Sequence, residues 1–134
     1  MPSVTIGSGS RVLTLSADQG ASRPDELVVD LRAETLSASA RIYALEFGDL
    51  AAYFDDLVVD WRGWTGARVW RSLEGDLEIS AKHQRHVLLR VFLRGDRYRS
   101  DWGATATLEL DPGEQLSEVA RAVRVLVVGP IPMP

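Results

Sequence analysis

The sequence holds few side chains of the kinds that catalyse reactions or bind metal ions. It has no cysteine, and its two histidines lie together in the segment His83-Gln84-Arg85-His86. A metal ion would need at least one further ligand, and side chains in a tight turn before a strand point in different directions. We therefore expect these histidines to lie in a solvated turn, and we predict neither a metal nor a cofactor.

Signatures of nucleophilic catalysis and of phosphate binding are missing as well. No Gly-x-Ser-x-Gly elbow occurs, and the pair Ser8-Gly9 is typical of a flexible turn near the N-terminus. The segments Gly7–Gly9 and Gly63–Gly66 do not stand between a strand and a helix, as a phosphate-binding loop requires. These observations predict that the protein is not an enzyme.

A first candidate binding surface is an acidic stripe on a helix that is predicted to begin at Asp49. Helical spacing places four side chains on one face: Asp49, Tyr53, Asp56 and Asp60. Carboxylates at the C-terminal end of a helix each cost about 0.3–1 kcal/mol unless a cation compensates them. Three arginines follow and are the expected compensators: Arg62, Arg68 and Arg71. The stripe is either a solvated face with local ion pairs or a docking surface for a basic partner.

A second candidate surface is the corner that follows this helix, Trp61–Gly66. Its glycines allow a sharp turn, and its tryptophans can cover the edge of a sheet or the underside of the helix. Alternatively, Trp64, Arg68 and Trp70 form a partly exposed cluster that binds a protein, because Trp, Tyr and Arg dominate the energetics of protein interfaces. Both interpretations stay open, and the two surfaces together supply the candidate protein-binding residues.

Apolar periodicity predicts the two helices of the fold. The apolar stripe of the first helix comprises Phe47, Leu50, Phe54, Leu57, Val58 and Trp61. The second helix is expected to start at Asp111–Glu114, with Asp111 as the N-cap, and to stop at Gly129-Pro130. Its apolar stripe comprises Leu116, Val119, Ala120, Val123 and Val127. Replacing Asp111 by alanine is therefore expected to cost about 1 kcal/mol.

Alternation of apolar and polar residues predicts strands on both sides of the first helix. The expected strands are residues 3–6, 11–16, 26–33 and 35–44, and then 67–72, 77–81, 86–94 and 102–110. Trp102, Ala104 and Ala106 should face inward, and the small alanines should leave room for Phe54 and Trp61. The predicted fold class is α+β: a twisted antiparallel sheet of about 6–8 strands with two helices packed on one face, a two-layer sandwich.

Length and charge bound the organisation and the partners. A chain of 134 residues fits a single domain, in which residues 1–25 form variable N-terminal strands and a loop, 26–128 the core and 129–134 a loose tail. Residues 1–61 carry 4 basic and 10 acidic side chains, whereas residues 62–99 carry 9 and 4. Such opposed blocks neutralise one another after folding, so no nucleic-acid partner is predicted.

The sequence has no apolar run long enough to span a membrane and no signal peptide at its N-terminus. It needs no disulfide, because it has no cysteine. We therefore expect a cytoplasmic protein that does not bind membranes. Arginine makes up all but one of the basic residues, which favours a bacterial genome of high GC content.

Residues 26–127 resemble the WapI-type immunity proteins and related actinobacterial domains of unknown function. The resemblance lies in hydrophobic spacing and a few glycines, along Asp49–Leu57, Gly66, Ser72–Ile79 and His86-Val87 and in the final helix. Members of the immunity group bind and mask a toxin. The resemblance implies an α+β architecture and a protein partner, with a toxin as the expected class.

Three functional hypotheses follow from the sequence. The first is a protein-binding module, an immunity-like antitoxin acting through the acidic stripe or the tryptophan corner. The second is a small ligand-binding protein or enzyme that uses an arginine-lined sheet face: Arg41, Arg90 and Arg94. The third is a structural homo-oligomer, such as a homodimer, that pairs through the face around Leu88 and Phe92.

Overall fold

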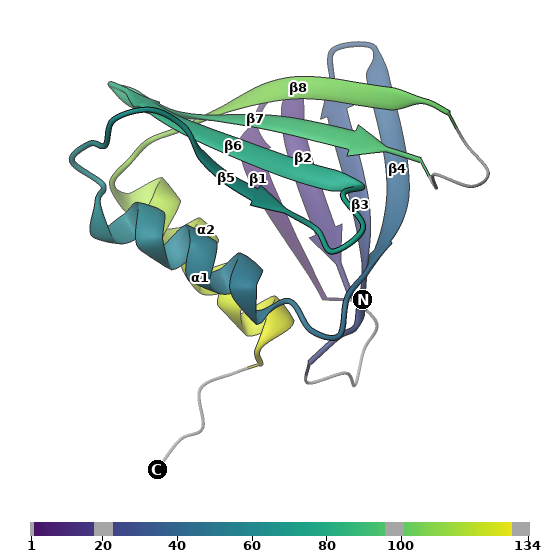
Figure 1. Ribbon diagram of the computed structural model, residues 1–134. Coiled ribbons are helices and arrows are strands. Elements are labelled where there is room, and N and C mark those ends of the chain that lie inside the picture. Colours follow the sequence, from purple (N-terminus) through teal and green to yellow (C-terminus); the bar gives the residue numbers. More distant parts are fainter. Residues whose placement is uncertain (1, 18–22, 96–100, 130–134) are drawn as a thin grey trace.

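The computed structural model describes residues 2–17, 23–95 and 101–129 (Figure 1). Eight strands and two helices follow one another in these parts: β1 (Ser3–Ser8), β2 (Arg11–Ser16), β3 (Glu26–Ala33), β4 (Leu36–Tyr43), α1 (Gly48–Val59), β5 (Arg68–Arg71), β6 (Leu77–Gln84), β7 (His86–Arg94), β8 (Gly103–Leu110) and α2 (Glu114–Val127). Every ladder between neighbouring strands is antiparallel. The predicted α+β class and order of elements are confirmed.

The strands form two sheets of four strands, β1-β2-β3-β4 and β5-β6-β7-β8. The single continuous sheet expected from the sequence is thus divided at α1, which separates β4 from β5 along the chain. The strands of the second sheet run across those of the first (Figure 1). Contacts of β8 with β1, β2 and β3 hold the two sheets together.

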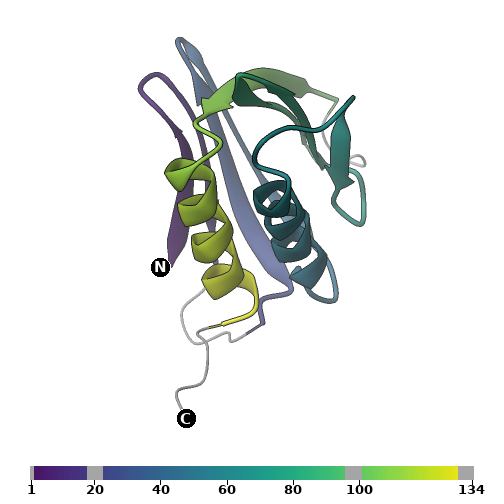
Figure 2. The ribbon, with the colours of Figure 1, turned by 90° about the vertical axis from the view of Figure 1, so that its left-hand side faces the viewer.

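Both helices lie side by side and close the same side of the two sheets (Figure 2). Phe54 of α1 and Val123 of α2 are fully buried, as the two apolar stripes predict. An ion pair between Asp55 and Arg124 links the helices at their half-exposed edge. The helices therefore close the apolar core that both sheets share.

Alternating burial along the strands confirms most of the predicted inward faces. In β7, Val87, Leu89, Val91 and Leu93 are all fully buried. Ala104 and Ala106 of β8 face the core as expected. Two tryptophans are exceptions, because α1 ends before Trp61 and β8 begins after Trp102, so that both indoles are exposed. The expectation that the alanines make room for Trp61 is therefore wrong.

The two predicted helix caps are wrong as well. The N-cap of α1 is Phe47 and that of α2 is Gly113, and neither makes a side-chain capping bond. Asp49 lies inside the first turn of α1, where its negative charge suits the helix dipole. Asp111 lies ahead of α2, and its backbone N–H donates to Oε1 of Gln115 at 2.8 Å. The expected loss of stability on replacing Asp111 therefore has no structural basis.

The C-terminal end of α2 follows the prediction more closely. Gly129 has a φ of 106°, and its N–H donates to the backbone oxygens of Arg124 and Val125. Only glycine adopts this conformation without strain, so the helix stops there. The rest of the predicted loose tail, residues 130–134, lies outside the described residues. Neither described helix is long and apolar enough to cross a membrane.

Candidate protein-binding surface

Helix α1 and strand β5 face each other across a seam that two side-chain hydrogen bonds hold together. The hydroxyl of Tyr53 on α1 donates to the backbone oxygen of Arg68 at 2.9 Å. The indole Nε1 of Trp70 on β5 donates to the Asp49 carboxylate at 3.1 Å. These bonds fix β5, which is an edge strand of the second sheet, above the helix.

Burial raises the pKa of Tyr53 well above its usual range, while the nearby charge of Arg68 lowers it in part. Desolvation is the larger effect, because the phenolate would lose most of its water on forming in this half-buried position. Tyr53 therefore remains a neutral hydrogen-bond donor at physiological pH. Its role at the seam is structural.

Arg68 compensates the negative C-terminal end of α1, as the sequence predicts. Its guanidinium lies 2.8 Å from the Asp60 carboxylate and donates to the backbone oxygen of Asp56 at 3.4 Å. The other two expected compensators serve different partners. Arg62 stacks on the ring of Trp61, and Arg71 pairs with Glu78 at 3.1 Å. The prediction holds for one arginine of the three.

The tryptophan corner is anchored from within. The indole of Trp64 donates to the backbone oxygen of Ala81 at 3.2 Å and meets the His83 ring edge-on at 5.2 Å. The guanidinium of Arg68 also stacks on this indole, 5.1 Å from the ring centre. Trp64 is half-buried and Trp70 is buried, which fits the structural interpretation for both. Trp61 is the tryptophan of this corner that is exposed.

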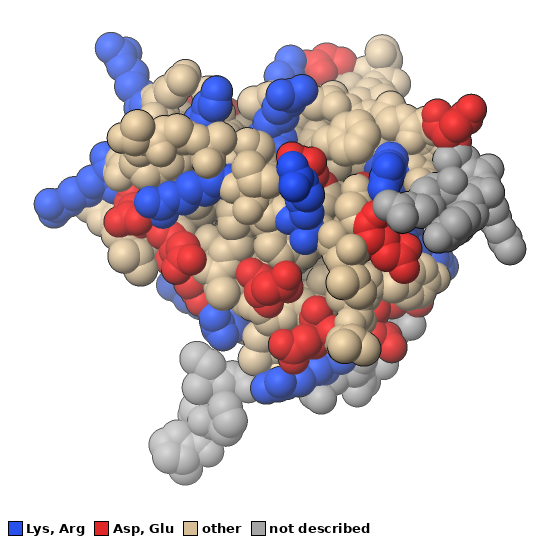
Figure 3. Space-filling model, in the orientation of Figure 1, with Lys and Arg blue, Asp and Glu red and all other residues tan. Residues whose placement is uncertain are grey.

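Two hollows lie along the seam. The first, of about 480 Å³, is lined by Tyr53, Asp56, Val59, Asp60, Arg68 and Val69. The second, of about 350 Å³, is lined by Ala44, Leu45, Glu46, Phe47, Asp49, Trp70, Arg71 and Leu73. We call the two together the α1–β5 groove. Figure 3 shows this face of the molecule, with acidic side chains over α1 and basic ones above them towards β5.

The groove brings together most of the candidate residues that the sequence singles out. Six of the seven line it, and Trp64 lies beside it through its contact with Arg68. Sequence reasoning missed the apolar rim, which consists of Leu45, Val59, Val69 and Leu73. Leu45 and Leu73 belong to loops, where periodicity gives no expectation of a face.

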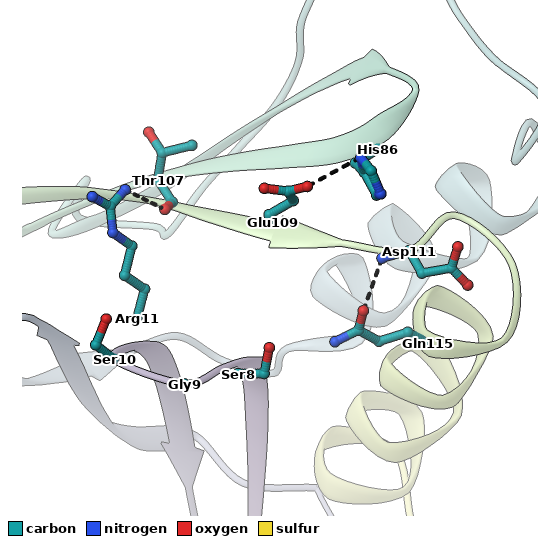
Figure 4. A pocket seen from close by; sticks show the side chains of 9 residues that line it. All are labelled: Ser8, Gly9, Ser10, Arg11, His86, Thr107, Glu109, Asp111 and Gln115. Carbon is teal, nitrogen blue, oxygen red and sulfur yellow. Dashed lines mark hydrogen bonds and ion pairs between the residues drawn. The ribbon is translucent and has the colours of Figure 1, made fainter.

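A polar pocket of about 580 Å³ lies at the opposite edge of the second sheet, beside β8 (Figure 4). Its lining comes from the β1–β2 hairpin, β7, β8 and the segment that leads into the first turn of α2: Ser8, Gly9, Ser10, Arg11, His86, Thr107, Glu109, Asp111 and Gln115. Nδ1 of His86 lies 3.0 Å from the Glu109 carboxylate, which resembles the orientation of a general base. Both side chains are more than half exposed, so water screens this pair, and we assign no reaction to it.

This pocket could not be found in the sequence, because its residues come from four separate segments. The two histidines do diverge as expected, since Nε2 of His83 lies 2.8 Å from the Trp61 backbone oxygen, whereas Nδ1 of His86 lies 3.0 Å from the Glu109 carboxylate. The expectation that both histidines lie in a turn is wrong, because β6 continues to Gln84 and includes His83, while β7 begins at His86. Among the described residues, no group of three His, Asp or Glu side chains is placed to hold a metal ion.

The arginines of the predicted sheet face are not gathered in one site. Arg41 belongs to the first sheet and pairs with Glu26, whereas Arg94 in the second sheet pairs with Asp76. Arg90 lines a separate hollow of about 210 Å³ with Glu78, Ser80 and Phe92. Leu88 and Phe92, the centre of the predicted homodimer face, are each partly covered.

Comparison with known proteins places most of the chain in one family. The model of the family of unknown function DUF6228 matches residues 5–129. No curated protein and no solved structure matches the chain.

Proposed function

The chain belongs to DUF6228, a family of unknown function, and we propose that it is a protein-binding domain whose partner docks in the α1–β5 groove. The supporting observation is the exposed apolar rim of that groove. Leu45 is 94% exposed, Val59 78% and Leu73 74%. Single exposed aliphatic side chains are ordinary, but several along one concave seam are typical of an interaction surface.

The charges of the groove favour a partner that is both apolar and basic. Helix α1 carries three aspartates and no basic residue. Within the described residues, Asp60 pairs with Arg68, whereas no hydrogen bond or ion pair engages the Asp56 carboxylate. A lysine or arginine of the partner would pair with Asp56 while apolar side chains cover the rim.

Masking is the mode of action that we propose for this binding. The resemblance of residues 26–127 to the WapI-type immunity proteins supports it, and it favours a toxin as the partner. A domain of this size can inactivate a toxin by covering its active surface, which requires no catalytic group. Masking of this kind therefore needs no chemistry from the polar pocket.

Site-specific photo-crosslinking in the native host tests this proposal. A photoreactive amino acid replaces Val59 at the rim of the groove, and a matched variant carries it at Val125, which is 49% exposed on α2. We expect one discrete crosslinked protein from the Val59 variant and none from the Val125 variant. That protein, once identified by mass spectrometry, must also bind the purified chain.

The purified pair decides the outcome. If the crosslinked protein is a toxin, adding the chain should abolish its activity at a stoichiometry near one to one. A protein that crosslinks equally from Val59 and Val125 would contradict the proposed surface. A captured protein with no affinity for the purified chain would contradict the proposed function.

A further inference from the structure

We propose that the partner docks by adding an extended segment to the edge of the second sheet, antiparallel to β5 and next to α1. This inference rests on the proposed function and specifies how binding occurs. It commits to a strand of another protein as the occupant of the groove. The hydrogen-bonding direction of β5, the spacing of the two hollows and their different chemistry support it.

The backbone of β5 presents free hydrogen-bonding groups at the sheet edge. Just beyond β5, the N–H of Ser72 donates to the oxygen of Leu77 on β6 at 2.9 Å. In an antiparallel ladder, the backbone N–H and C=O groups of every second residue point to the same neighbouring strand. The backbone N–H and C=O of Trp70 therefore point to β6, like the N–H of Ser72. The backbone N–H and C=O groups of Val69 and Arg71 point away from β6.

No strand lies beyond β5 in the described parts of the chain, since β5 ends the order of its sheet. Val69 is 47% exposed, so solvent reaches this residue of the edge strand. An added strand could form hydrogen bonds with Val69 and Arg71, the two residues of β5 whose backbone N–H and C=O groups point away from β6. So short a ladder provides register but modest affinity, and most of the affinity must come from side chains.

The two hollows have the spacing that alternate side chains of such a strand require. Arg68 and Val69 line the first hollow, and Trp70 and Arg71 line the second. The corresponding residues of the two pairs are two positions apart, or about 7 Å along a strand. Side chains i and i+2 of an added strand lie on the same face and would enter one hollow each.

The lining of the hollows specifies those two side chains. The first hollow contains two carboxylates, Asp56 and Asp60, and one guanidinium, that of Arg68. Because Arg68 pairs with Asp60, the Asp56 carboxylate is the group that favours a basic side chain. The second is walled by Leu45, Trp70 and Leu73, which favour an apolar one. An antiparallel strand meets the second hollow first, so the segment reads apolar-x-basic from its N-terminus. All three ladders of this sheet are antiparallel, which supports that direction.

A library of random linear peptides displayed on phage, selected on the intact immobilised chain, supplies the probe. We expect the selected peptides to share an apolar-x-basic pair. In the complex, hydrogen exchange measured by NMR should slow by about tenfold or more at the amides of Val69 and Arg71. Exchange at Trp70, which already faces β6, should not change.

Methylation of the peptide backbone provides the matched control and leaves the chain unaltered. N-methyl groups on the peptide amides that face β5 should weaken binding by about tenfold or more, because each removes a ladder hydrogen bond. N-methyl groups on the alternate amides should have little effect. Equal effects of both substitutions would overturn the inference.

The failure of this inference can be told apart from the failure of the proposed function. If peptides shift the NMR signals of the groove residues without slowing hydrogen exchange at Val69 and Arg71, strand addition is overturned. The groove would then remain the binding surface. Peptides that bind only elsewhere would contradict the groove itself. If the amides of Val69 and Arg71 already exchange slowly in the chain without peptide, and sedimentation shows a dimer, a second copy of the chain is the occupant. That result would overturn the inference.

Discussion

Single side chains hold the seam between α1 and β5, and Arg68 has the largest share of these contacts. Its guanidinium contacts Asp60, the end of α1 and the Trp64 ring, while its backbone oxygen accepts the hydroxyl of Tyr53. The sequence correctly pointed to an arginine at this place, because the negative end of α1 needs a nearby cation. It could not say which arginine, since that depends on the path of the corner.

The buried indole of Trp70 provides a test at the scale of one residue. Trp70→Phe removes the bond to Asp49 and leaves a space in the core, and we expect a loss of about 2 kcal/mol in the free energy of unfolding. Urea denaturation measures it. The control Trp102→Phe changes an exposed indole and should stay within about 0.5 kcal/mol of the original chain. Equal stability of both variants would contradict the structural role of Trp70.

Tyr53 predicts a dependence of stability on alkaline pH. Burial raises its pKa in the folded chain, so the folded state keeps the phenolic proton where the unfolded state, with a pKa of about 10, has lost it. The stabilising effect is present below about pH 10 and is lost as the pH rises above it. Urea denaturation at about pH 9 and about pH 11 should therefore show a smaller loss for Tyr53→Phe than for the original chain. An equal loss of stability in both proteins would show that the raised pKa of Tyr53 does not cause the dependence on pH.

At the scale of elements, sequence reasoning was reliable for strands and poor for caps. The bounds of β3 and β7 agree with the prediction, because alternation over eight or nine residues marks one buried face. Both predicted N-caps failed, because a cap depends on the backbone path that enters the helix. Burial of Phe47 sets that path for α1. A favourable residue type alone does not reveal it.

The start of α2 tests this correction. Asp111→Ala should change the free energy of unfolding by less than about 0.5 kcal/mol, because its carboxylate does not cap the helix. Gln115→Ala should cost about 1 kcal/mol, because Oε1 of Gln115 accepts the N–H of Asp111. Thermal or urea denaturation of both variants measures the difference. A larger loss for Asp111→Ala would restore the cap predicted from the sequence.

The β1–β2 hairpin offers a second test at this scale. Gly7 has a φ of 97°, and a Cβ atom there would lie 2.5 Å from the backbone oxygen of Arg11. Gly7→Ala should therefore cost more than about 2 kcal/mol, whereas Gly9→Ala, whose Cβ meets no atom within 4 Å, should cost about 1 kcal/mol. Urea denaturation compares them. Similar losses would show that backbone conformation, and not the close contact, decides the cost.

At the scale of the whole molecule, the sequence predicted the class and content of the fold but not its division into two sheets. Alternation determines which face of a strand is buried, but it carries no information about where a ladder between strands ends. The candidate residues from Asp49 to Trp70 came together because one helix and the next strand carry them. Leu45 and Leu73 escaped prediction because they join the surface only after folding.

The most direct test of the proposed function is isothermal titration calorimetry of the purified chain with the protein that the Val59 variant captures. Asp56→Arg reverses the charge of a groove carboxylate that has no ion pair among the described residues, and it should weaken binding by about tenfold or more. Glu118→Arg makes the same change at an exposed acid of α2 and should leave the Kd within about twofold. Equal affinities of the two variants, or a loss confined to Glu118→Arg, would contradict binding through the α1–β5 groove.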